Sequence, residues 1–283
     1  MAHYRLCDIM AVSKTGVKRL FLLDYGTVAC DLGWIIPNPS RVSERGTSKP
    51  VQWVEGPVSG ALIEHRDGVI LVDTGSHPEA EKVWPKDAWE YFPMTRFTAE
   101  NLLENQLKLA GYKPEDIHFV VFTHLHLDHA GQAYKLRDYK PLFIMHEDEL
   151  KHALYMIWLG KIGAYLPQDL EALKSANIFT FADSYLELLP GIELYRFGGH
   201  TPGSIVMKVT TDTGNTYILA GDFIHSPLEL ELETKGWLLG NYEEFLRGIK
   251  ILKLWLKRLN TRLITCHDPD IWNKYPKAPK HLE

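Results

Sequence analysis

The chain of 283 residues is long enough for one large domain or two small ones, and its 45% of hydrophobic residues allow a sizeable core. Its formal net charge is -5 at pH 7 and it has no long run of Lys or Arg, which argues against a nucleic-acid-binding protein. No apolar stretch is long enough to cross a bilayer, so a membrane-spanning protein is not expected either.

Strands are expected where short apolar runs end in turn residues. In the first half of the chain these runs cover residues 19–24, 58–65, 68–73, 117–122 and 141–146. Residues 38–50 are polar and contain Pro, Ser, Arg and Gly, which indicates a long loop. Thr98 is a suitable N-cap for a helix through Leu109, and Gly111 is a typical stop signal.

The second half of the chain mixes helices with strands. Helices are expected at residues 147–160, 168–175 and 242–259, and strands at residues 192–197, 204–210, 216–221 and 262–266. Because this order roughly repeats in each half, we expect a layered α/β domain with sheets inside and helices outside. The prediction is a single domain over residues 1–283, with an N-terminal loop extension at about 25–57 and a helical insertion at about 147–180.

Four potential metal ligands follow the strand expected at 117–122, namely His124, His126, Asp128 and His129. Imidazole nitrogens and carboxylate oxygens suit zinc and similar borderline ions. In a turning loop, His124 and His126 can point the same way, whereas Asp128 and His129 can serve a second point a few ångströms away. One ion cannot easily use all four side chains, so the spacing favours two neighbouring ions over isolated core or surface histidines.

Three more residues of this kind stand at strand-to-loop junctions, namely His200, Asp222 and His267. Strand ends are where a rigid scaffold presents functional groups to a cleft. A carboxylate between two sets of histidines is the natural bridge between two cations. The sequence therefore predicts two divalent metal ions, with zinc as the expected ion and iron, manganese or cobalt as alternatives.

These motifs resemble, in their type and order, those of the metallo-β-lactamase superfamily, and the resemblance extends from Val58 to Asp268. The motifs are Leu71-Val72-Asp73-Thr74-Gly75, His124 to His129, Gly199-His200-Thr201-Pro202-Gly203, Gly221-Asp222 and His267-Asp268. The resemblance implies an αββα four-layer sandwich that holds the metals at one edge of its two sheets.

The same resemblance implies a role for each ligand. One metal would be held by His124, His126 and His200, and the other by Asp128, His129 and His267, with Asp222 bridging both. Asp73 would orient the ligands from behind, although an ordinary turn residue is an equally good interpretation.

The ligand set indicates a hydrolytic reaction. Two ions roughly 3.5–4 Å apart can share a hydroxide whose pKa is lowered towards neutrality, and this hydroxide can attack a carbonyl carbon. Asp128 would hold the hydroxide and later pass a proton to the leaving group, so no Ser or Cys nucleophile is needed. A metal-binding protein without catalysis is the alternative from another class, and the complete ligand set argues against it.

Among the subfamilies, the sequence resembles N-acyl-homoserine lactone lactonases, which open the lactone ring of quorum signals. The resemblance rests on the long segment before Leu71, the run Thr123 to Gly131 and the pair His267-Asp268. Dinuclear zinc β-lactamases typically have Cys in place of Asp222, and glyoxalase II-like thioesterases carry basic residues for glutathione that this sequence does not reveal. Another lactonase and a thioesterase stay open as alternatives.

The sequence departs from these lactonases at His225. Many of them have Tyr three residues after the bridging Asp, where it hydrogen-bonds the substrate carbonyl. The imidazole of His225 could donate to the developing oxyanion or act as an acid, and a surface histidine in a loop is the alternative. We expect Asp128 and His225 to be the catalytic side chains.

Large apolar residues gather in three further stretches, Trp34 to Ile36, Trp84 to Phe92 and Leu154 to Trp158. At helical spacing such residues are more often part of a core. Some of them are nevertheless expected to line a pocket for the acyl chain of a small-molecule lactone, or else a subunit interface, which leaves a homodimer open.

The cysteines are Cys7, Cys30 and Cys266. An odd and sparse set without a CxxC pair does not make a disulfide framework. The N-terminal residues have no continuous apolar core of signal-peptide length. We therefore expect a reducing, cytoplasmic location.

Overall fold

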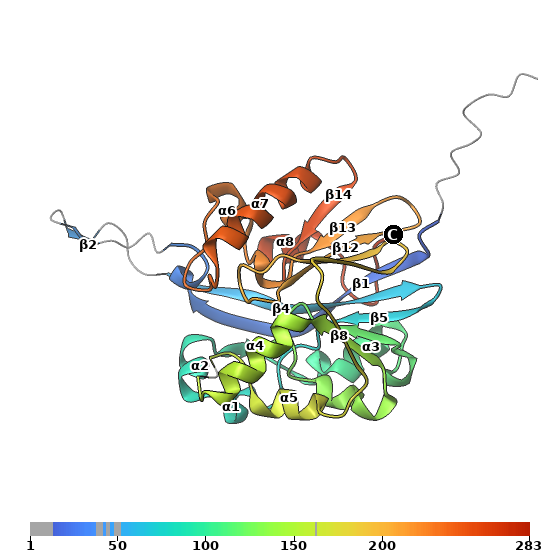
Figure 1. The fold of residues 1–283 in the computed structure, drawn as a ribbon, viewed down its shortest axis with the longest axis horizontal. Coiled ribbons are helices and arrows are strands. Elements are labelled where there is room, and N and C mark those ends of the chain that lie inside the picture. The colour runs from blue at the N-terminus through green and yellow to red at the C-terminus, as the bar shows by residue number, and fades with distance from the viewer. Residues whose placement is uncertain (1–13, 38–41, 44–45, 48–51, 162) are drawn as a thin grey trace, which may run out of the picture.

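The computed structural model describes residues 14–37, 42–43, 46–47, 52–161 and 163–283. Two sheets stack face to face, and helices cover their outer faces, so the elements form four layers (Figure 1). The αββα sandwich implied by the resemblance is therefore confirmed. Among the described residues, no helix combines the length and the apolar character that crossing a membrane requires.

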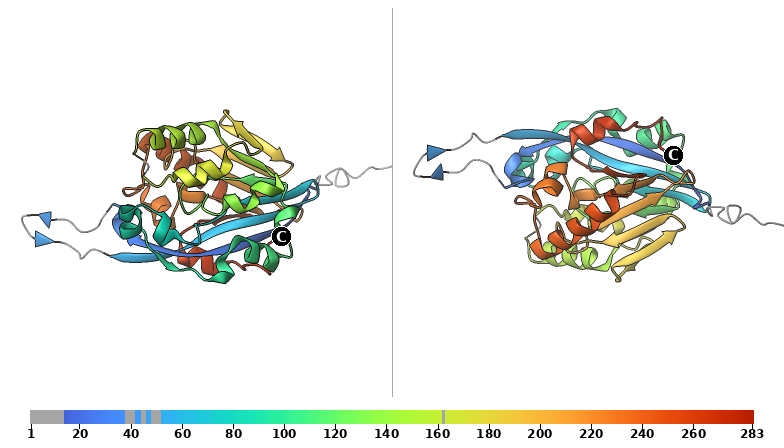
Figure 2. Two further views of the ribbon diagram at one scale, coloured as in Figure 1. Left: turned by 90° about the horizontal axis from the view of Figure 1, so that it is seen from below. Right: turned by 90° about the horizontal axis from the view of Figure 1, so that it is seen from above.

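The larger sheet has seven strands in the order β6-β1-β4-β5-β7-β8-β9. Its strands are β1 (Val17–Asp31), β4 (Trp53–His65), β5 (Gly68–Val72), β6 (Met94–Arg96), β7 (Phe119–Val121), β8 (Leu142–His146) and β9 (Ile178–Phe181). The long strands β1 and β4 pair antiparallel, whereas β5, β7, β8 and β9 run parallel to one another. The short strands β2 (Val42–Ser43) and β3 (Gly46–Thr47) pair only with each other, away from the sandwich (Figure 2).

The smaller sheet has five strands in the order β10-β11-β12-β13-β14. They are β10 (Tyr185–Leu189), β11 (Ile192–Arg196), β12 (Ile205–Thr210), β13 (Thr216–Leu219) and β14 (Thr261–Ile264). β13 and β14 run parallel, and the other neighbours run antiparallel. The sequence analysis missed β9 and β10, which are short strands at the sheet edges. Only their pairing with β8 and β11 identifies them as strands.

Helices from residues 80–173 cover the larger sheet, and helices from residues 227–274 cover the smaller one (Figure 1). The former are α1 (Ala80–Val83), α2 (Lys86–Tyr91), α3 (Leu103–Ala110), α4 (Glu147–Trp158) and α5 (Pro167–Leu173), and the latter are α6 (Pro227–Leu232), α7 (Tyr242–Leu256) and α8 (Pro269–Lys274). Short 3-10 helices are η2 (Leu32–Trp34), η3 (Ala99–Asn101), η4 (Pro114–Asp116), η5 (Ala133–Tyr139) and η6 (Gly221–Phe223). Unlike the other helices, α8 packs against strands of both sheets, namely β4 and β14.

The alternation of apolar residues along the strands explains the layering. In β4, Leu62 packs on the helix-covered side of the larger sheet, whereas the next residue, Ile63, lies between the two sheets. In β12, Val206 packs towards α7 and Met207 lies between the sheets. Successive side chains of a strand point to opposite faces, so strands that are apolar at every position are buried on both sides.

The expected loop extension at 25–57 is wrong at both ends. Residues 27–31 continue β1 and pair with residues 53–57 of β4. The chain crosses Tyr25-Gly26 with a shift in register, and pairing resumes beyond the apolar run that the sequence pattern could detect. Of the residues in between, 38–41, 44–45 and 48–51 lie outside the described part.

Two helical predictions also need correction. The segment at 147–180 is helical in α4 and α5, but residues 178–180 belong to β9. The helix expected from Thr98 to Leu109 is broken at Leu102, whose backbone is extended. Thr98 does cap a helical turn, η3, and Gly111 ends α3 with a left-handed φ of 88°, as predicted.

Candidate metal centre

The predicted ligands follow the carboxyl ends of strands in both sheets. β5 and β7 run in parallel with Val72 beside Val121, and β13 and β14 run in parallel with Leu219 beside Ile264. These strand ends meet at one edge of the sandwich. The side chains gathered there are His124, His126, Asp128 and His129 after β7, His200 between β11 and β12, Asp222 after β13, and His267 after β14.

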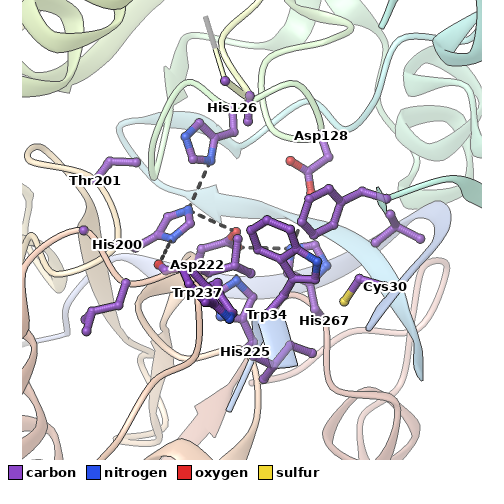
Figure 3. A pocket seen from close by; sticks show the side chains of 18 of the residues that line it. Cys30, Trp34, His126, Asp128, His200, Thr201, Asp222, His225, Trp237 and His267 are labelled. Carbon is purple, nitrogen blue, oxygen red and sulfur yellow. Dashed lines mark hydrogen bonds and ion pairs between the residues drawn. The ribbon is translucent and has the colours of Figure 1, made fainter. Parts of the chain in front are cut away.

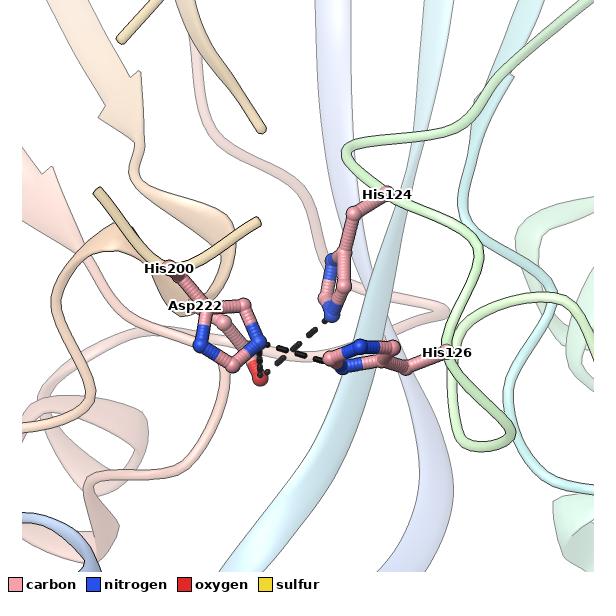
Figure 4. A group of neighbouring side chains, drawn as sticks. All are labelled: His124, His126, His200 and Asp222. Carbon is pink, nitrogen blue, oxygen red and sulfur yellow. Dashed lines mark hydrogen bonds and ion pairs between the residues drawn. The ribbon is translucent and has the colours of Figure 1, made fainter. Parts of the chain in front are cut away.

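The first group of side chains consists of His124, His126, His200 and Asp222 (Figure 4). One donor atom from each lies within 4.8 Å of all the others. Oδ2 of Asp222 is 3.5 Å from Nε2 of His200 and 3.6 Å from Nε2 of His124. Nδ1 of His126 is 3.1 Å from Nε2 of His200. This geometry could hold one metal ion.

The second group consists of Asp128, His129 and His267, and it meets the other oxygen of Asp222. Oδ1 of Asp222 is 3.2 Å from Nε2 of His129 and 3.1 Å from Nε2 of His267. Oδ2 of Asp128 is 3.4 Å from the same nitrogen of His267. The two carboxylate oxygens of Asp222 therefore face two different sets of ligands.

Three of the histidine rings are fixed from behind through Nδ1. The contacts are to Oδ2 of Asp73 for His129, to the carbonyl oxygen of Leu238 for His200 and to the carbonyl oxygen of Pro57 for His267, each at 2.8 Å. Carbonyl and carboxylate oxygens only accept hydrogen bonds, so Nδ1 carries the proton and donates it. Nε2 is then left with a free lone pair directed into the site, as a metal ligand requires.

Several buried atoms of the site have no hydrogen-bond partner among the described residues. They are Nε2 of His124, Nε2 of His129 and Oδ1 of Asp222. A buried polar group without a partner costs about 1–3 kcal/mol, so three of them in one place need an explanation. Cations fit, because they would bind these same lone pairs.

The charge states of the histidines are also suited to metal binding. Burial lowers the pKa of His124 and His200 well below the ordinary value, and it lowers the pKa of His126 to about 4. These imidazoles are neutral at pH 7, as metal ligands must be. Burial also acts to lower the pKa of His129 and His267, but the carboxylate of Asp222 helps to raise both above the ordinary value. In the second group a proton therefore competes with a cation for the same nitrogen.

Asp73 lies behind the ligands and touches them. Its Oδ1 accepts a hydrogen bond from the backbone N–H of Thr123 at 2.8 Å, and its Oδ2 accepts from Oγ1 of Thr123 at 2.7 Å. The same Oδ2 accepts from His129. These contacts give Asp73 more than the role of an ordinary turn residue.

Glu149 was not identified from the sequence, although it joins the two ligand-bearing loops. Its fully buried carboxylate accepts hydrogen bonds from the backbone N–H of Leu125 and from Oγ1 of Thr201. Leu125 stands between His124 and His126 in the sequence, and Thr201 follows His200. The hydroxyl of Tyr165 donates to the carboxylate of Glu149 as well, at 3.0 Å. Acidic residues are common in the first turn of a helix, so the sequence carries no signal that Glu149 joins these loops.

His225 lies beside the ligands and is only 3% exposed, so the alternative of a surface histidine is wrong. Its Nε2 is 3.2 Å from Oδ2 of Asp222. Its Nδ1 faces Lys235 and Glu229, two buried residues that the sequence analysis did not single out. A lone lysine in a loop gives no sequence signal of such burial.

A cavity of about 1330 Å³ opens over both groups of ligands (Figure 3). Apolar side chains form much of its lining, among them Trp34, Ile36, Phe92, Met156 and Trp237. The expected apolar pocket therefore includes parts of all three predicted stretches. Other members of these stretches do not contribute, because Trp84 is buried in the core and Trp158 is 87% exposed to solvent.

The sequence model of the metallo-beta-lactamase superfamily matches residues 53–276, which include every predicted ligand. The chain belongs to this superfamily. Superfamily membership and the clustered His and Asp side chains together imply a divalent metal centre.

Relatives within the superfamily are named lactonases. The N-acyl homoserine lactonase AiiB of Agrobacterium fabrum is 32% identical over 214 residues, covering 72% of this chain and 76% of the relative. An N-acyl homoserine lactonase of Bacillus cereus is 29% identical, over 77% of this chain and 80% of the relative.

Solved structures share the fold. An N-acyl homoserine lactone hydrolase with the product N-hexanoyl-L-homoserine bound at its catalytic metal centre superposes with a TM-score of 0.79 at 24% identity, covering 94% of this chain and 99% of that structure. AidC, a dizinc quorum-quenching lactonase, superposes with a TM-score of 0.64 at 18% identity, covering 90% of this chain and 91% of that structure. At these identities the likeness concerns the fold.

Proposed function

We propose that this protein is a hydrolase that opens the lactone ring of N-acyl-homoserine lactones with the help of two bound zinc ions. The proposal is carried by Asp222, whose two carboxylate oxygens face two separate sets of ligands. Similarity to named lactonases such as AiiB supports the substrate class. The complete ligand set argues against a metal-binding protein without catalysis.

The first zinc ion would be held by His124, His126 and His200, and the second by Asp128, His129 and His267, with Asp222 between them. Such ions would activate a water molecule for attack and polarise the carbonyl group of the lactone. Ligands fixed through hydrogen bonds behind them keep the two positions apart without the cost of rearrangement.

Two side chains of the protein would handle protons and charge during ring opening. Asp128 lies at the cavity wall, where its carboxylate would take a proton from the attacking water and deliver it to the departing ring oxygen. His225 would donate a hydrogen bond through Nε2 to the carbonyl oxygen as that oxygen becomes negative. In this role the imidazole replaces the Tyr of other lactonases.

The charge of the cavity favours a neutral lactone over a glutathione thioester. Acidic side chains at its exposed wall are Glu55, Asp87 and Asp270. The basic Arg196 is engaged by Glu244 at 2.7 Å, which leaves Lys161 as an exposed cation of the lining. The carboxylates of glutathione would be repelled here, whereas an acyl chain would pack against the apolar wall.

A metal analysis combined with a substrate panel tests the proposal. We expect two zinc ions per chain, hydrolysis of acyl-homoserine lactones that is lost on chelation and regained on adding zinc, and little activity on S-lactoylglutathione. His225→Ala should lower kcat about 100-fold, the usual cost of one oxyanion donor.

Contrary results would separate the parts of the proposal. If fully loaded protein opens no lactone of any chain length, the substrate class is wrong. Preference for the thioester would identify a thioesterase instead. Full activity of His225→Ala would remove the role given to His225.

A further inference from the structure

Lys235 lies in the loop between α6 and α7, and its ammonium group is fully buried behind His225. Its Nζ is 2.8 Å from Nδ1 of His225 and 2.8 Å from Oε1 of Glu229. It also donates to the carbonyl oxygens of Asp222 at 2.9 Å and Phe223 at 3.2 Å. A buried cation with this many partners is positioned by the fold.

These neighbours determine which nitrogen of His225 carries the proton. The carboxylate of Glu229 and the carbonyl oxygen of Asp222 can only accept hydrogen bonds, so Lys235 supplies a proton to each. The third proton has two possible acceptors, Nδ1 of His225 at 2.8 Å and the carbonyl oxygen of Phe223 at 3.2 Å, and a proton on Nδ1 would point at the ammonium group itself. Nδ1 must then accept this hydrogen bond, which leaves the ring proton on Nε2.

Glu229 alone would enforce the opposite arrangement. Its Oε2 accepts hydrogen bonds from the backbone N–H groups of His225 and Ser226, and its Oε1 lies 3.4 Å from Nδ1 of His225. Oδ2 of Asp222, 3.2 Å from Nε2 of His225, competes for the same proton as long as it is not bound to zinc. In zinc-loaded protein without Lys235, Oε1 of Glu229 would therefore draw the ring proton to Nδ1. Nε2 would then present a lone pair beside Asp222, as a metal ligand does, and could not donate to a substrate.

We propose that Lys235 is a positioning residue that keeps His225 in the tautomer with its proton on Nε2, so that His225 acts as a hydrogen-bond donor and is excluded from metal binding. This inference rests on the proposed function for its catalytic consequence. The tautomer itself can be measured without any substrate.

The test uses NMR of the full chain labelled with ¹⁵N-histidine, both zinc-free and zinc-loaded, with His225 assigned by comparison with His225→Gln. In the unchanged protein we expect a protonated Nε2 and an unprotonated Nδ1. In zinc-loaded protein, Lys235→Met should move the proton to Nδ1 and lower kcat for lactone hydrolysis about 100-fold. Lys253→Met is the matched control, because Lys253 pairs with Glu233 at the surface.

A second variant distinguishes tautomer control from a merely structural role. In Lys235→Met/Glu229→Gln, the amide oxygen can still accept from the two backbone N–H groups, which turns the amide N–H towards Nδ1 of His225. We expect the proton to return to Nε2 and kcat to recover to within about tenfold of the original value. The double variant also avoids a buried charge without a partner, so it should fold even if Lys235→Met does not.

The outcomes are separable. A proton on Nδ1 in the unchanged protein, or an unchanged tautomer in folded, zinc-loaded Lys235→Met, would overturn the inference. A double variant with the Nδ1 tautomer would do the same. If the tautomers behave as expected but no lactone is opened, the proposed function fails and the role of Lys235 in fixing the ring stands.

Discussion

Oδ2 of Asp73 lies 2.8 Å from Nδ1 of His129, and the backbone of Asp73 itself has a left-handed φ of 56°. Few residues other than Gly, Asn and Asp adopt this conformation readily. The turn after β5 thus has an unfavourable backbone conformation, and in this conformation the carboxylate of Asp73 reaches both Thr123 and His129.

Asp73→Asn should weaken metal binding about 10- to 100-fold. Asn tolerates the backbone conformation, but its amide group would present hydrogens to Thr123 and His129, which are themselves donors. A competition titration of zinc against a chelator measures the change. Asp67→Asn, in an exposed turn, is the control, and equal affinities in all three proteins would contradict the role of Asp73.

Glu149→Gln should lower the free energy of unfolding by about 2 kcal/mol, because the amide cannot accept all the hydrogen bonds that meet the carboxylate. The loss should be larger in zinc-loaded than in zinc-free protein, since both ligand-bearing loops depend on Glu149. Urea unfolding with and without zinc tests this. Glu147→Gln changes an exposed carboxylate of the same helix and should have little effect.

Trp34→Ala should raise KM for long-chain lactones about tenfold and leave short-chain lactones nearly unchanged. The indole packs against Phe92 with ring centroids 4.9 Å apart and forms part of the apolar cavity wall, which we expect to hold the acyl chain. Steady-state kinetics over a series of chain lengths measures the difference. Trp158→Ala, on the exposed face of α4, is the control, and a uniform loss across chain lengths would contradict this use of Trp34.

Asp169 in α5 should make stability depend on pH. It is 3% exposed, and burial raises its pKa to about 7. Because the folded protein favours the protonated form, this carboxyl has no cost below its ordinary pKa, costs stability progressively as the pH rises from about 4 to about 7, and adds no further cost above that. The cost approaches about 4 kcal/mol at high pH.

Asp169→Asn removes that ionisation. The free energy of unfolding of the variant minus that of the original protein should increase from pH 4 to pH 8. This increase is expected whatever the difference between the two proteins is at pH 4. Denaturant unfolding at a series of pH values measures this difference, with the exposed Asp138→Asn as the control. A difference that does not change with pH would show that Asp169 stays charged in the folded protein.

Much of the sandwich could be predicted because its strands repeat a simple apolar pattern. The strands around Ile63 and Met207 were found from runs of apolar residues, since both faces of these strands are buried. Where β1 continues past Gly26, the pattern fails, because its polar and small residues are held by pairing with β4 on one side and the short strand β6 on the other. The edge strands β9 and β10 are apolar but only four and five residues long, and only their pairing with a neighbouring strand identifies them.

The sequence by itself determined which side chains could bind metal, because ligand chemistry belongs to residue types and their local spacing at strand ends. It also determined the family, since those motifs stand in a fixed order along the chain. Only the tertiary structure decided that the two oxygens of Asp222 face different ligand sets and that Glu149 and Lys235 support the site. These relationships join residues from separate elements, and their distances exist only after the two sheets have packed together.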